Sequence, residues 1–459
     1  MPFSFSSSSL TNPSLRNLVW CRNWAKKDWA IAAFGFTLIV FAFALLSDSP
    51  RAAVQKLPKL NQQAPLVKLT LLRNAKDRGA LCLDGSVPGY HFQEGFGSGS
   101  EKWLLHIEGG GWCDSISSCT RRKYTRIGSS IYMEKEIPFP GILSSDPLQN
   151  PDFFNWNKVN IRYCDGASLA GHPENDIKEG SRLFFRGQLI WEALMDELLS
   201  IGMSRAKQAL LSGCSAGGLA TLIHCDEFRE LFPEDANVKC LSDAGGAVSF
   251  SLSCTLFISN ALLIKLAEYV SIYQVLQKVC TRIVLLKWNR TRQLSNDLLY
   301  SIPSTYDLQL QCFFPEEIVK NIKTPVFLVN PAYDYWQIQH VLVPEGSDPH
   351  DHWKSCRLSI SNCNNDQLDV LQGFRSSMLK AMNSFQQQKG HGMFINSCFI
   401  HCQTVQEETW HSANSPKINN KTIAESVGDW YFNRSEDVKQ IDCPYPCNPT
   451  CYNKDFTRP

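Results

Sequence analysis

The chain has 459 residues, of which 44% are hydrophobic, 11% aromatic and 19% charged, and its formal net charge is +1. This composition is typical of a folded chain with a substantial core, and it excludes an extended disordered protein. The near-zero net charge gives no general attraction to nucleic acid, so we expect no nucleic-acid partner. The length suits one large α/β domain with insertions and a tail.

The first 64 residues differ from the rest of the chain. Residues 1–28 are polar and end in a basic stretch, whereas residues 29–46 carry no charge. An uncharged run close to membrane-spanning length after basic residues predicts a signal-anchor, with residues 1–28 cytosolic and the catalytic region lumenal or extracellular. A cleaved signal peptide is the alternative, and both place the protein in the secretory pathway. Residues 47–64 are interpreted as a linker, and the catalytic domain is expected over 65–459.

Cysteine usage fits the same route. Of the 18 cysteines, all but Cys21 lie after residue 80, which predicts disulfides formed in an oxidising compartment. Zinc is not expected, because neither Cys398-x3-Cys402 nor the tail cluster at 443–451 contains a C-x2-C pair. We expect the tail cysteines to close the fold, and Cys214 is a candidate for a free thiol. Possible N-glycosylation sites are Asn289, Asn420 and Asn433.

A glycine loop follows an apolar run at residues 103–108 that is typical of a buried strand. Backbone N–H groups of glycines can approach an oxygen closely, so Gly110 and Gly111 are candidate oxyanion donors; a tight turn is the simpler alternative. The basic segment 118–130 comes next, and an acidic sugar polymer could lie against it, although an ordinary solvated loop has the same pattern. The candidate substrate-binding residues here are Trp112, Arg121 and Arg122.

The prediction of function depends most on Gly213-x-Ser215-x-Gly217. An apolar run enters this motif and a helix-like run leaves it, which is the strand–turn–helix context of a nucleophile elbow. The turn would hold Ser215 in a strained conformation with its hydroxyl exposed, and it needs small residues on either side. The N–H of Ala216 would be a further oxyanion donor.

The acid of a Ser–Asp–His triad is expected at the end of a late strand. The run 323–330 is such a strand, and it opens onto Asp334, our preferred acid. Asp243 also follows a short apolar run, but an aspartate before a glycine turn is more usual as a cap.

Chain order then requires a histidine after the acid. His401 lies after the apolar run 393–395, where the loop following the last strand is expected, and is our preferred base. His391 lies just before that run and is the runner-up. A triad of this kind needs neither a metal nor an organic cofactor.

Taken together, these motifs resemble those of the plant pectin acetylesterase family, relatives of the animal carboxylesterase Notum. The matching stretches are spread over most of residues 65–451. They are I-E-G-G-G-W-C (107–113), G-C-S-A-G-G (213–218), L-S-D-A-G (241–245), C-F-F-P (312–315), T-P-V-F-L-V-N-P-A-Y-D (324–334), F-I-N-S-C-F-I-H-C-Q (394–403) and D-C-P-Y-P-C-N-P-T-C (442–451).

The resemblance implies an α/β-hydrolase fold and a serine esterase that removes acetyl groups from galacturonan in the plant cell wall. It implies the triad Ser215, Asp334 and His401, with oxyanion donors from the loop at 110–111 and from Ala216. The partners implied are acetylated pectin and, if the apolar N-terminal segment is retained, a membrane.

Residues 246–310 depart from the family pattern, and this is the part that helps to wall the pocket in relatives. Its cysteines, Cys254 and Cys280, do not obviously match family cysteines, so the segment is either an unusual insertion or a gene-model artefact. Two alternatives to the main interpretation follow. One is an esterase or lipid deacylase acting on another acyl group, and the other is an inactive wall-binding homologue.

Overall fold

The computed structural model describes residues 65–113, 115–172, 182–245, 318–344, 346–436 and 438–457. The apolar run 29–46 and the atypical segment 246–310 both lie outside these ranges. Within them, every helix is too short or too polar to cross a membrane.

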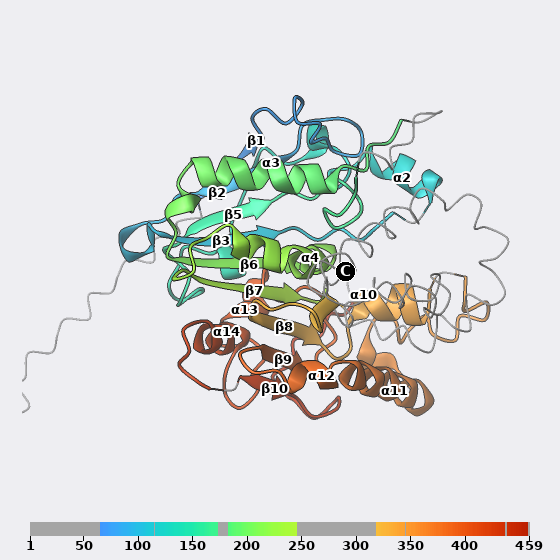
Figure 1. Cartoon of the computed structure of the whole chain (residues 1–459). Helices are drawn as coiled ribbons and strands as arrows, with labels where there is room; N and C mark the ends of the chain where they lie inside the picture. Colours follow the sequence, from blue (N-terminus) through green and yellow to red (C-terminus); the bar gives the residue numbers. More distant parts are fainter. Residues whose placement is uncertain are drawn as a thin grey trace, which may run out of the picture. The chain divides into compact units, whose positions relative to one another are not determined.

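A ten-stranded mixed sheet forms the centre of the catalytic domain, in the order β10-β9-β8-β7-β6-β3-β5-β2-β1-β4 (Figure 1). The run from β5 to β10 is parallel, and β2, β1 and β4 are added antiparallel at one edge. This confirms the α/β fold class. The strands are β1 (Val67–Leu71), β2 (Gly89–Gln93), β3 (Lys102–Ile107), β4 (Glu136–Ile137), β5 (Asn157–Ile161), β6 (Gln208–Cys214), β7 (Asn237–Asp243), β8 (Val326–Pro331), β9 (Gly392–Asn396) and β10 (Lys439–Ile441).

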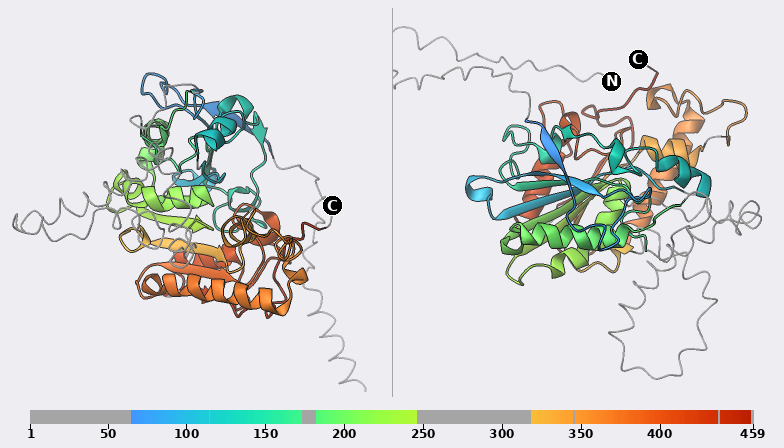
Figure 2. Two further views of the ribbon diagram at one scale, coloured as in Figure 1. Left: turned by 90° about the vertical axis from the view of Figure 1, so that its right-hand side faces the viewer. Right: turned by 90° about the horizontal axis from the view of Figure 1, so that it is seen from above.

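Helices cover both faces of the sheet (Figure 2). They are α2 (Ile116–Arg122), α3 (Gly187–Ser200), α4 (Ala216–Glu230), α10 (Tyr335–Gln337), α11 (Asn365–Ala381), α12 (Asn383–Gln386), α13 (Glu407–Trp410) and α14 (Ile423–Tyr431). Capping boxes begin three of them, α2, α11 and α14. The capping box of α11 pairs Asn364 with Gln367, and that of α14 pairs Thr422 with Glu425.

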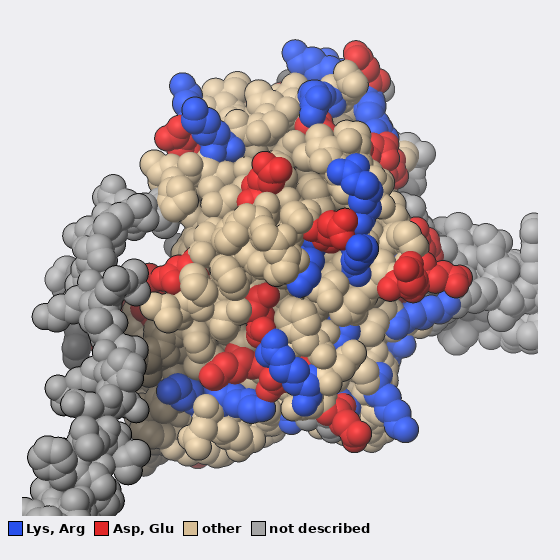
Figure 3. All heavy atoms as spheres, turned by 90° about the vertical axis from the view of Figure 1, so that its left-hand side faces the viewer, with Lys and Arg blue, Asp and Glu red and all other residues tan. Residues whose placement is uncertain are grey.

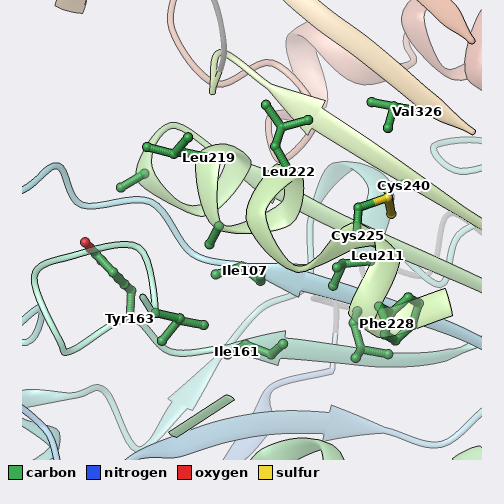
Figure 4. Packing of buried hydrophobic residues seen from close by; sticks show 14 of the residues in the cluster. Ile107, Ile161, Tyr163, Leu211, Leu219, Leu222, Cys225, Phe228, Cys240 and Val326 are labelled. Atoms are coloured by element: carbon green, nitrogen blue, oxygen red, sulfur yellow. A yellow bond between two sulfur atoms is a disulfide. The ribbon is translucent and has the colours of Figure 1, made fainter. Parts of the chain in front are cut away.

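Two hydrophobic cores result, because successive strand residues point to opposite faces of the sheet. Leu105 and Leu211 join the core beneath α3, α4 and α11, whereas Leu104 and Leu210 join the core beneath α14. Figure 4 shows the first core, with side chains of α4 such as Phe228 packed over the strands. The central strands are therefore buried on both faces, which explains their continuous apolar sequences.

The carboxyl ends of the parallel strands meet along one edge of the sheet. The register pairs Ile107 with Gly213, Cys214 with Asp243, and Asn396 with Pro331. In Figure 1, α2 and α10 lie beyond this edge. Open α/β sheets bind their ligands outside the carboxyl ends of the strands, so this edge is where a site is expected.

Seven disulfides cross-link the domain, and every cysteine within the described ranges is paired. They are Cys82–Cys164, Cys113–Cys119, Cys214–Cys402, Cys225–Cys240, Cys356–Cys363, Cys398–Cys451 and Cys443–Cys447. The expected disulfide-rich domain with a cross-linked tail is confirmed. The suggestion that Cys214 is a free thiol is wrong, because its partner lies 188 residues further along the chain and only the folded sheet brings them together.

The surface charges are mixed in sign. On the face seen in Figure 3, lysine and arginine side chains alternate with aspartate and glutamate, and no large patch of one sign forms there. This distribution agrees with the balanced composition.

Candidate active site

Ser215 occupies the sharp turn between β6 and α4. Its backbone angles are φ 56° and ψ −122°, a region that non-glycine residues rarely adopt and that stores strain. The glycines two residues before and after Ser215 are required because a larger side chain would not fit there. A Cβ atom on Gly213 would lie 2.2 Å from the carbonyl oxygen of Gly217, and one on Gly217 would lie 2.1 Å from that of Ile107. The backbone therefore has the strand–turn–helix geometry expected from the motif.

His401 and Asp334 form a buried pair in which the imidazole Nδ1 lies 2.6 Å from the carboxylate Oδ2. The other carboxylate oxygen, Oδ1, accepts from the backbone N–H of Gln337 at 3.1 Å, so the carboxylate cannot rotate freely. Burial lowers the pKa of His401, but the charge and hydrogen bond of Asp334, together with the charge of Asp243, outweigh it, and the net pKa is raised. Because Asp334 accepts from Nδ1, the neutral imidazole presents Nε2 as an acceptor.

The runner-up histidine, His391, lies elsewhere. Its Nδ1 accepts from the backbone N–H of Val326, the first residue of β8, at 3.1 Å. Asp334 follows the opposite end of that strand, so His391 and the His401–Asp334 pair are at different ends of the sheet. Burial lowers the pKa of His391.

Asp243, the second candidate acid, accepts hydrogen bonds from backbone N–H groups rather than from the imidazole. Its Oδ2 accepts from the N–H groups of Gln403 and Thr404 at 2.6 and 2.7 Å, and from the Thr404 hydroxyl at 2.8 Å. Its own carbonyl oxygen accepts from the N–H of Ser215 at 2.8 Å. Burial raises the pKa of Asp243 to about 6, against the opposing effect of these hydrogen bonds and of His401. Asp243 therefore joins the serine turn to the loop after β9 that contains His401, which is called the histidine loop below.

The Cys214–Cys402 disulfide holds the backbone segments that contain Ser215 and His401 next to each other. The two cysteine Cα atoms are 5.5 Å apart, and each cysteine directly neighbours one of these residues. Since consecutive Cα atoms are about 3.8 Å apart, the Cα atoms of Ser215 and His401 are separated by at most about 13 Å. A ring nitrogen of His401 also lies within 4.8 Å of both sulfur atoms. The serine turn and the loop that contains His401 are therefore neighbours at this edge of the sheet.

Two groups of side chains in the described ranges are of the types that bind metals: Cys214, His401 and Cys402, and Asp442, Cys443 and Cys447. In both groups the two sulfur atoms are joined to each other. Disulfide sulfur is not a thiolate ligand, so neither group is a metal site in this oxidised form.

The glycine loop after β3 passes directly against the serine turn. A Cβ atom on Gly109 would lie 2.8 Å from the Cys214 carbonyl oxygen and 3.1 Å from Ser215 Cβ. Gly111 has φ 63°, in the left-handed region that favours glycine. Across the serine, Ala216 opens α4, where the first N–H groups of a helix have no partner within the helix.

Arg122 fixes the orientation of the glycine loop. Its side chain is buried, and its guanidinium donates to the carbonyl oxygens of Gly110 at 2.7 Å, Gly111 at 3.2 Å and Ile127 at 3.0 Å. In a trans peptide the C=O and the following N–H point in opposite directions, so the Gly111 N–H faces away from Arg122. This differs from the expectation that Arg122 contacts a polymer, because the packing of α2 turns Arg122 toward the glycine loop and leaves Arg121 exposed.

The other two candidate substrate-binding residues are more accessible. Arg121 is exposed and donates to the hydroxyl of Ser117 at 2.8 Å. Trp112 is half-buried at the end of the glycine loop, and its Nε1 donates to the hydroxyl of Ser168 at 2.7 Å.

A hydrogen-bond chain that no sequence motif predicts supports both oxyanion candidates. The Tyr163 hydroxyl donates to the Gly111 carbonyl at 2.9 Å and accepts from the N–H of Ser168 at 2.9 Å. The Ser168 hydroxyl donates to the Ala216 carbonyl at 2.7 Å. Tyr163 and Ser168 lie in the loop after β5, on the carboxyl edge, and that position is the only sequence signal that could have indicated them.

Two aromatic residues directly after Asp334 surround the imidazole. Trp336 stacks on His401 with ring centroids 5.9 Å apart, and Tyr335 meets it edge-on at 5.9 Å. A Cβ atom on Gly111 would lie 3.9 Å from the Trp336 indole. Trp336 therefore lies between the histidine and the glycine loop, and it was not predicted as a site residue.

A nucleophile turn after a central parallel strand, with the acid and the histidine reached later in the chain, is the arrangement of the α/β-hydrolases. Fold and site thus define a serine carboxylester hydrolase. The comparison with known families is more particular. Residues 60–452 match the family described as Pectinacetylesterase, and the chain belongs to that family. The resemblance found in the sequence is confirmed.

Curated relatives agree along nearly the whole chain. Pectin acetylesterase 5 of Arabidopsis thaliana is 54% identical over 97% of this chain and 99% of its own length. Pectin acetylesterase 4 of the same plant is 53% identical over 95% of this chain and 100% of its own length. A more distant relative, palmitoleoyl-protein carboxylesterase notum1 of Xenopus laevis, is 27% identical over 84% of this chain and 74% of its own length.

Among solved structures, the Wnt deacylase Notum from Drosophila matches with a TM-score of 0.61 and 20% sequence identity. The match covers 84% of this chain and 100% of that one. At this identity the likeness concerns the fold, and the predicted Notum-like α/β fold is confirmed.

Proposed function

We propose that this chain removes acetyl groups from acetylated pectin with Ser215 as nucleophile, His401 as general base and acid, and Asp334 as the residue that orients the imidazole. The observation that carries the assignment is the His401–Asp334 pair, at 2.6 Å, on the same sheet edge as the strained turn of Ser215. Membership in the pectinacetylesterase family and the names of the Arabidopsis relatives support acetylated pectin as the substrate.

In the first half of the reaction, the Ser215 hydroxyl attacks the acetyl carbonyl carbon while Nε2 of His401 takes its proton. Asp334 holds the Nδ1–H and stabilises the imidazolium that forms. The N–H of Ala216 and the N–H groups of the loop at 110–111 are assigned to the oxyanion, where one such donor is typically worth ~10²–10³ in rate. When the intermediate collapses, the sugar hydroxyl leaves with the proton from His401.

In the second half, His401 takes a proton from a water molecule that attacks the acetyl-serine. The same donors bind the second oxyanion, and the proton passes from His401 to Ser215 as acetate leaves. All these steps are acid–base and nucleophilic chemistry of the chain's own groups.

A location outside the cytosol is proposed on the seven disulfides, which persist in oxidising compartments. The plant cell wall, which contains the pectin substrate, is the proposed destination. Anchoring to a membrane through residues 29–46 is the finer form of this proposal. Mass spectrometry of the mature N-terminus tests it, because a cleaved chain would begin after residue 46.

A second candidate is deacylation of a longer acyl group, favoured by the relatives named palmitoleoyl-protein carboxylesterase. A panel of 4-nitrophenyl esters from acetyl to palmitoyl separates the two. Acetyl preference supports the pectin reaction, and a preference for chains of eight carbons or more, by the same assay, would favour the second candidate.

The test of the triad is Ser215→Ala in the secreted enzyme, assayed by acetate release from acetylated pectin. We expect the rate to fall on the order of 10⁵–10⁶, as for loss of a serine nucleophile in other triads. Ser347→Ala is the matched control, because Ser347 is exposed and bonds only to the nearby Pro344 carbonyl among the contacts described. Labelling by a fluorophosphonate should disappear in the first variant and persist in the second. Acetate release that survives Ser215→Ala would reject the assignment, as would a wild type that no fluorophosphonate labels.

A further inference from the structure

We propose that the Cys214–Cys402 disulfide is a positioning element of the active site, which sets the distance between the nucleophile turn and the histidine loop. The proposal rests on the proposed roles of Ser215 and His401. It concerns a bond to which the reaction itself assigns no chemistry.

The first argument is the place of the bond in the sheet. Cys214 is the last residue of β6, and Cys402 lies in the loop after β9. Two strands, β8 and β7, lie between β9 and β6 in the sheet order. With neighbouring strands about 4.8 Å apart, the two strand ends are separated by roughly 14 Å. The histidine loop must therefore fold back across the ends of two strands before Cys402 reaches Cys214.

The second argument is the backbone of the loop at the bond. Cys402 has φ 59°, a left-handed conformation that is unfavourable for a residue with a side chain. Such a conformation persists only when the surrounding structure imposes it. The bond to β6 is a constraint of that kind, and it acts one residue away from His401.

The third argument is that the neighbouring residues are held by other means. Asp243 on β7 holds the N–H groups of Gln403 and Thr404, and Gln406 donates to the His401 carbonyl at 2.9 Å. The loop thus stays attached to the sheet without the disulfide. What the disulfide adds is a fixed position for the segment that contains His401.

Of the seven disulfides in the described ranges, this is the one whose two cysteines directly neighbour the proposed nucleophile and base. Cys225–Cys240 is the instructive contrast. It is fully buried, whereas Cys402 is half-buried, and it joins α4 to β7 without reaching the histidine loop.

The experiment compares two double variants of the whole secreted enzyme, Cys214→Ala/Cys402→Ala and Cys225→Ala/Cys240→Ala. A displacement of the imidazole by about 1 Å costs up to ~10²-fold in rate. We therefore expect the first variant to lose about 10- to 100-fold in kcat for 4-nitrophenyl acetate, with KM changed by less than about 2-fold. The second variant should lower the melting temperature and leave kcat of the folded enzyme near the wild-type value.

A second measurement covers the case in which a variant does not fold. The folded wild type is treated with dithiothreitol, whose two thiols supply the two electrons that convert the disulfide to two thiols, and the reduced pairs are mapped by alkylation and mass spectrometry. The rate of inactivation by a fluorophosphonate should fall as Cys214 and Cys402 become reduced, as mapped in alkylated aliquots. It should recover when the remaining, unalkylated protein is reoxidised with oxidised glutathione. The Cys225→Ala/Cys240→Ala variant should keep this sensitivity.

Two results overturn the positioning role. One is a wild-type kcat in the folded Cys214→Ala/Cys402→Ala variant, and the other is an equal loss of kcat in both double variants. Either result leaves the proposed function standing, because the wild type still depends on Ser215. Activity that survives Ser215→Ala overturns the proposed function, and the positioning role with it.

Discussion

Arg122→Met tests whether the buried arginine orients the glycine loop or binds the polymer. Methionine keeps the unbranched stem of the side chain and removes the guanidinium. The change deletes three hydrogen bonds, to the carbonyl oxygens of Gly110, Gly111 and Ile127. It also deletes the cation that lies 5.2 Å from the ring centroid of Tyr163.

The expected loss of stability follows from those contacts. A hydrogen bond from a charged group contributes about 1.5–3 kcal/mol, and a buried carbonyl left without a partner costs about 1–3 kcal/mol. Because the three carbonyls share one donor group and can partly relax, we expect unfolding to become easier by roughly 2–4 kcal/mol. In catalysis, loss of one oxyanion donor costs ~10²–10³, and a displaced donor costs less, so we expect kcat to fall at least about 10-fold.

The assay uses a small ester and the polymer in parallel. If Arg122 acts through the glycine loop, kcat falls by the same factor for 4-nitrophenyl acetate and for acetylated pectin. Arg121→Met is the control: its side chain is exposed, and any effect it has should appear as a higher KM for the polymer alone. The reasoning is refuted if Arg122→Met raises KM for pectin and leaves hydrolysis of the small ester unchanged.

Three further predictions concern the same edge of the sheet. Asp334→Asn should lower kcat about 10⁴-fold. Because Asp334 raises the pKa of His401, its loss should also move the acidic limb of the kcat/KM profile to lower pH. An acidic limb that does not move contradicts the pairing. Tyr163→Phe removes a hydroxyl that supports the glycine loop, and should lower kcat about 10-fold for small and polymeric esters alike, whereas a loss confined to pectin would indicate polymer binding. Gly217→Ala puts a Cβ atom 2.1 Å from a backbone oxygen and should destabilise the fold by at least about 3 kcal/mol, measured by denaturant unfolding. Its control is Gly373→Ala in the open surface of α11, which should be neutral or stabilising.

The parts of the site that could be predicted from the sequence are those that local spacing dictates. The serine turn is recognisable because steric crowding imposes a glycine two residues before and two residues after Ser215. Asp334 and His401 are recognisable because both follow apolar strands late in the chain, and parallel strands end at one edge. His391 precedes β9 and His401 follows it, so only the direction of the strand shows which of the two lies at the edge with Ser215.

The parts that could not be predicted depend on contacts between distant segments. Arg121 and Arg122 are equivalent in sequence, and only the packing of α2 against the glycine loop buries the second. The pairing of Cys214 with Cys402 depends on how the loop after β9 folds back over the sheet, for which local sequence carries no signal. The supporting chain through Tyr163 and Ser168 joins three loops, so no single motif contains it.

The Cys225–Cys240 bridge has a consequence for how firmly the serine turn is held. It ties α4, the helix that begins at the nucleophile turn, to the neighbouring strand β7, so this helix cannot slide along the sheet. Across the proposed site, Tyr335 and Trp336 sit on α10, which continues directly into the π-helical turn Ile338–Leu342. The turn that carries Ser215 is thus tied to β7 by a covalent bond as well as by the hydrogen bond from its own N–H to the Asp243 carbonyl.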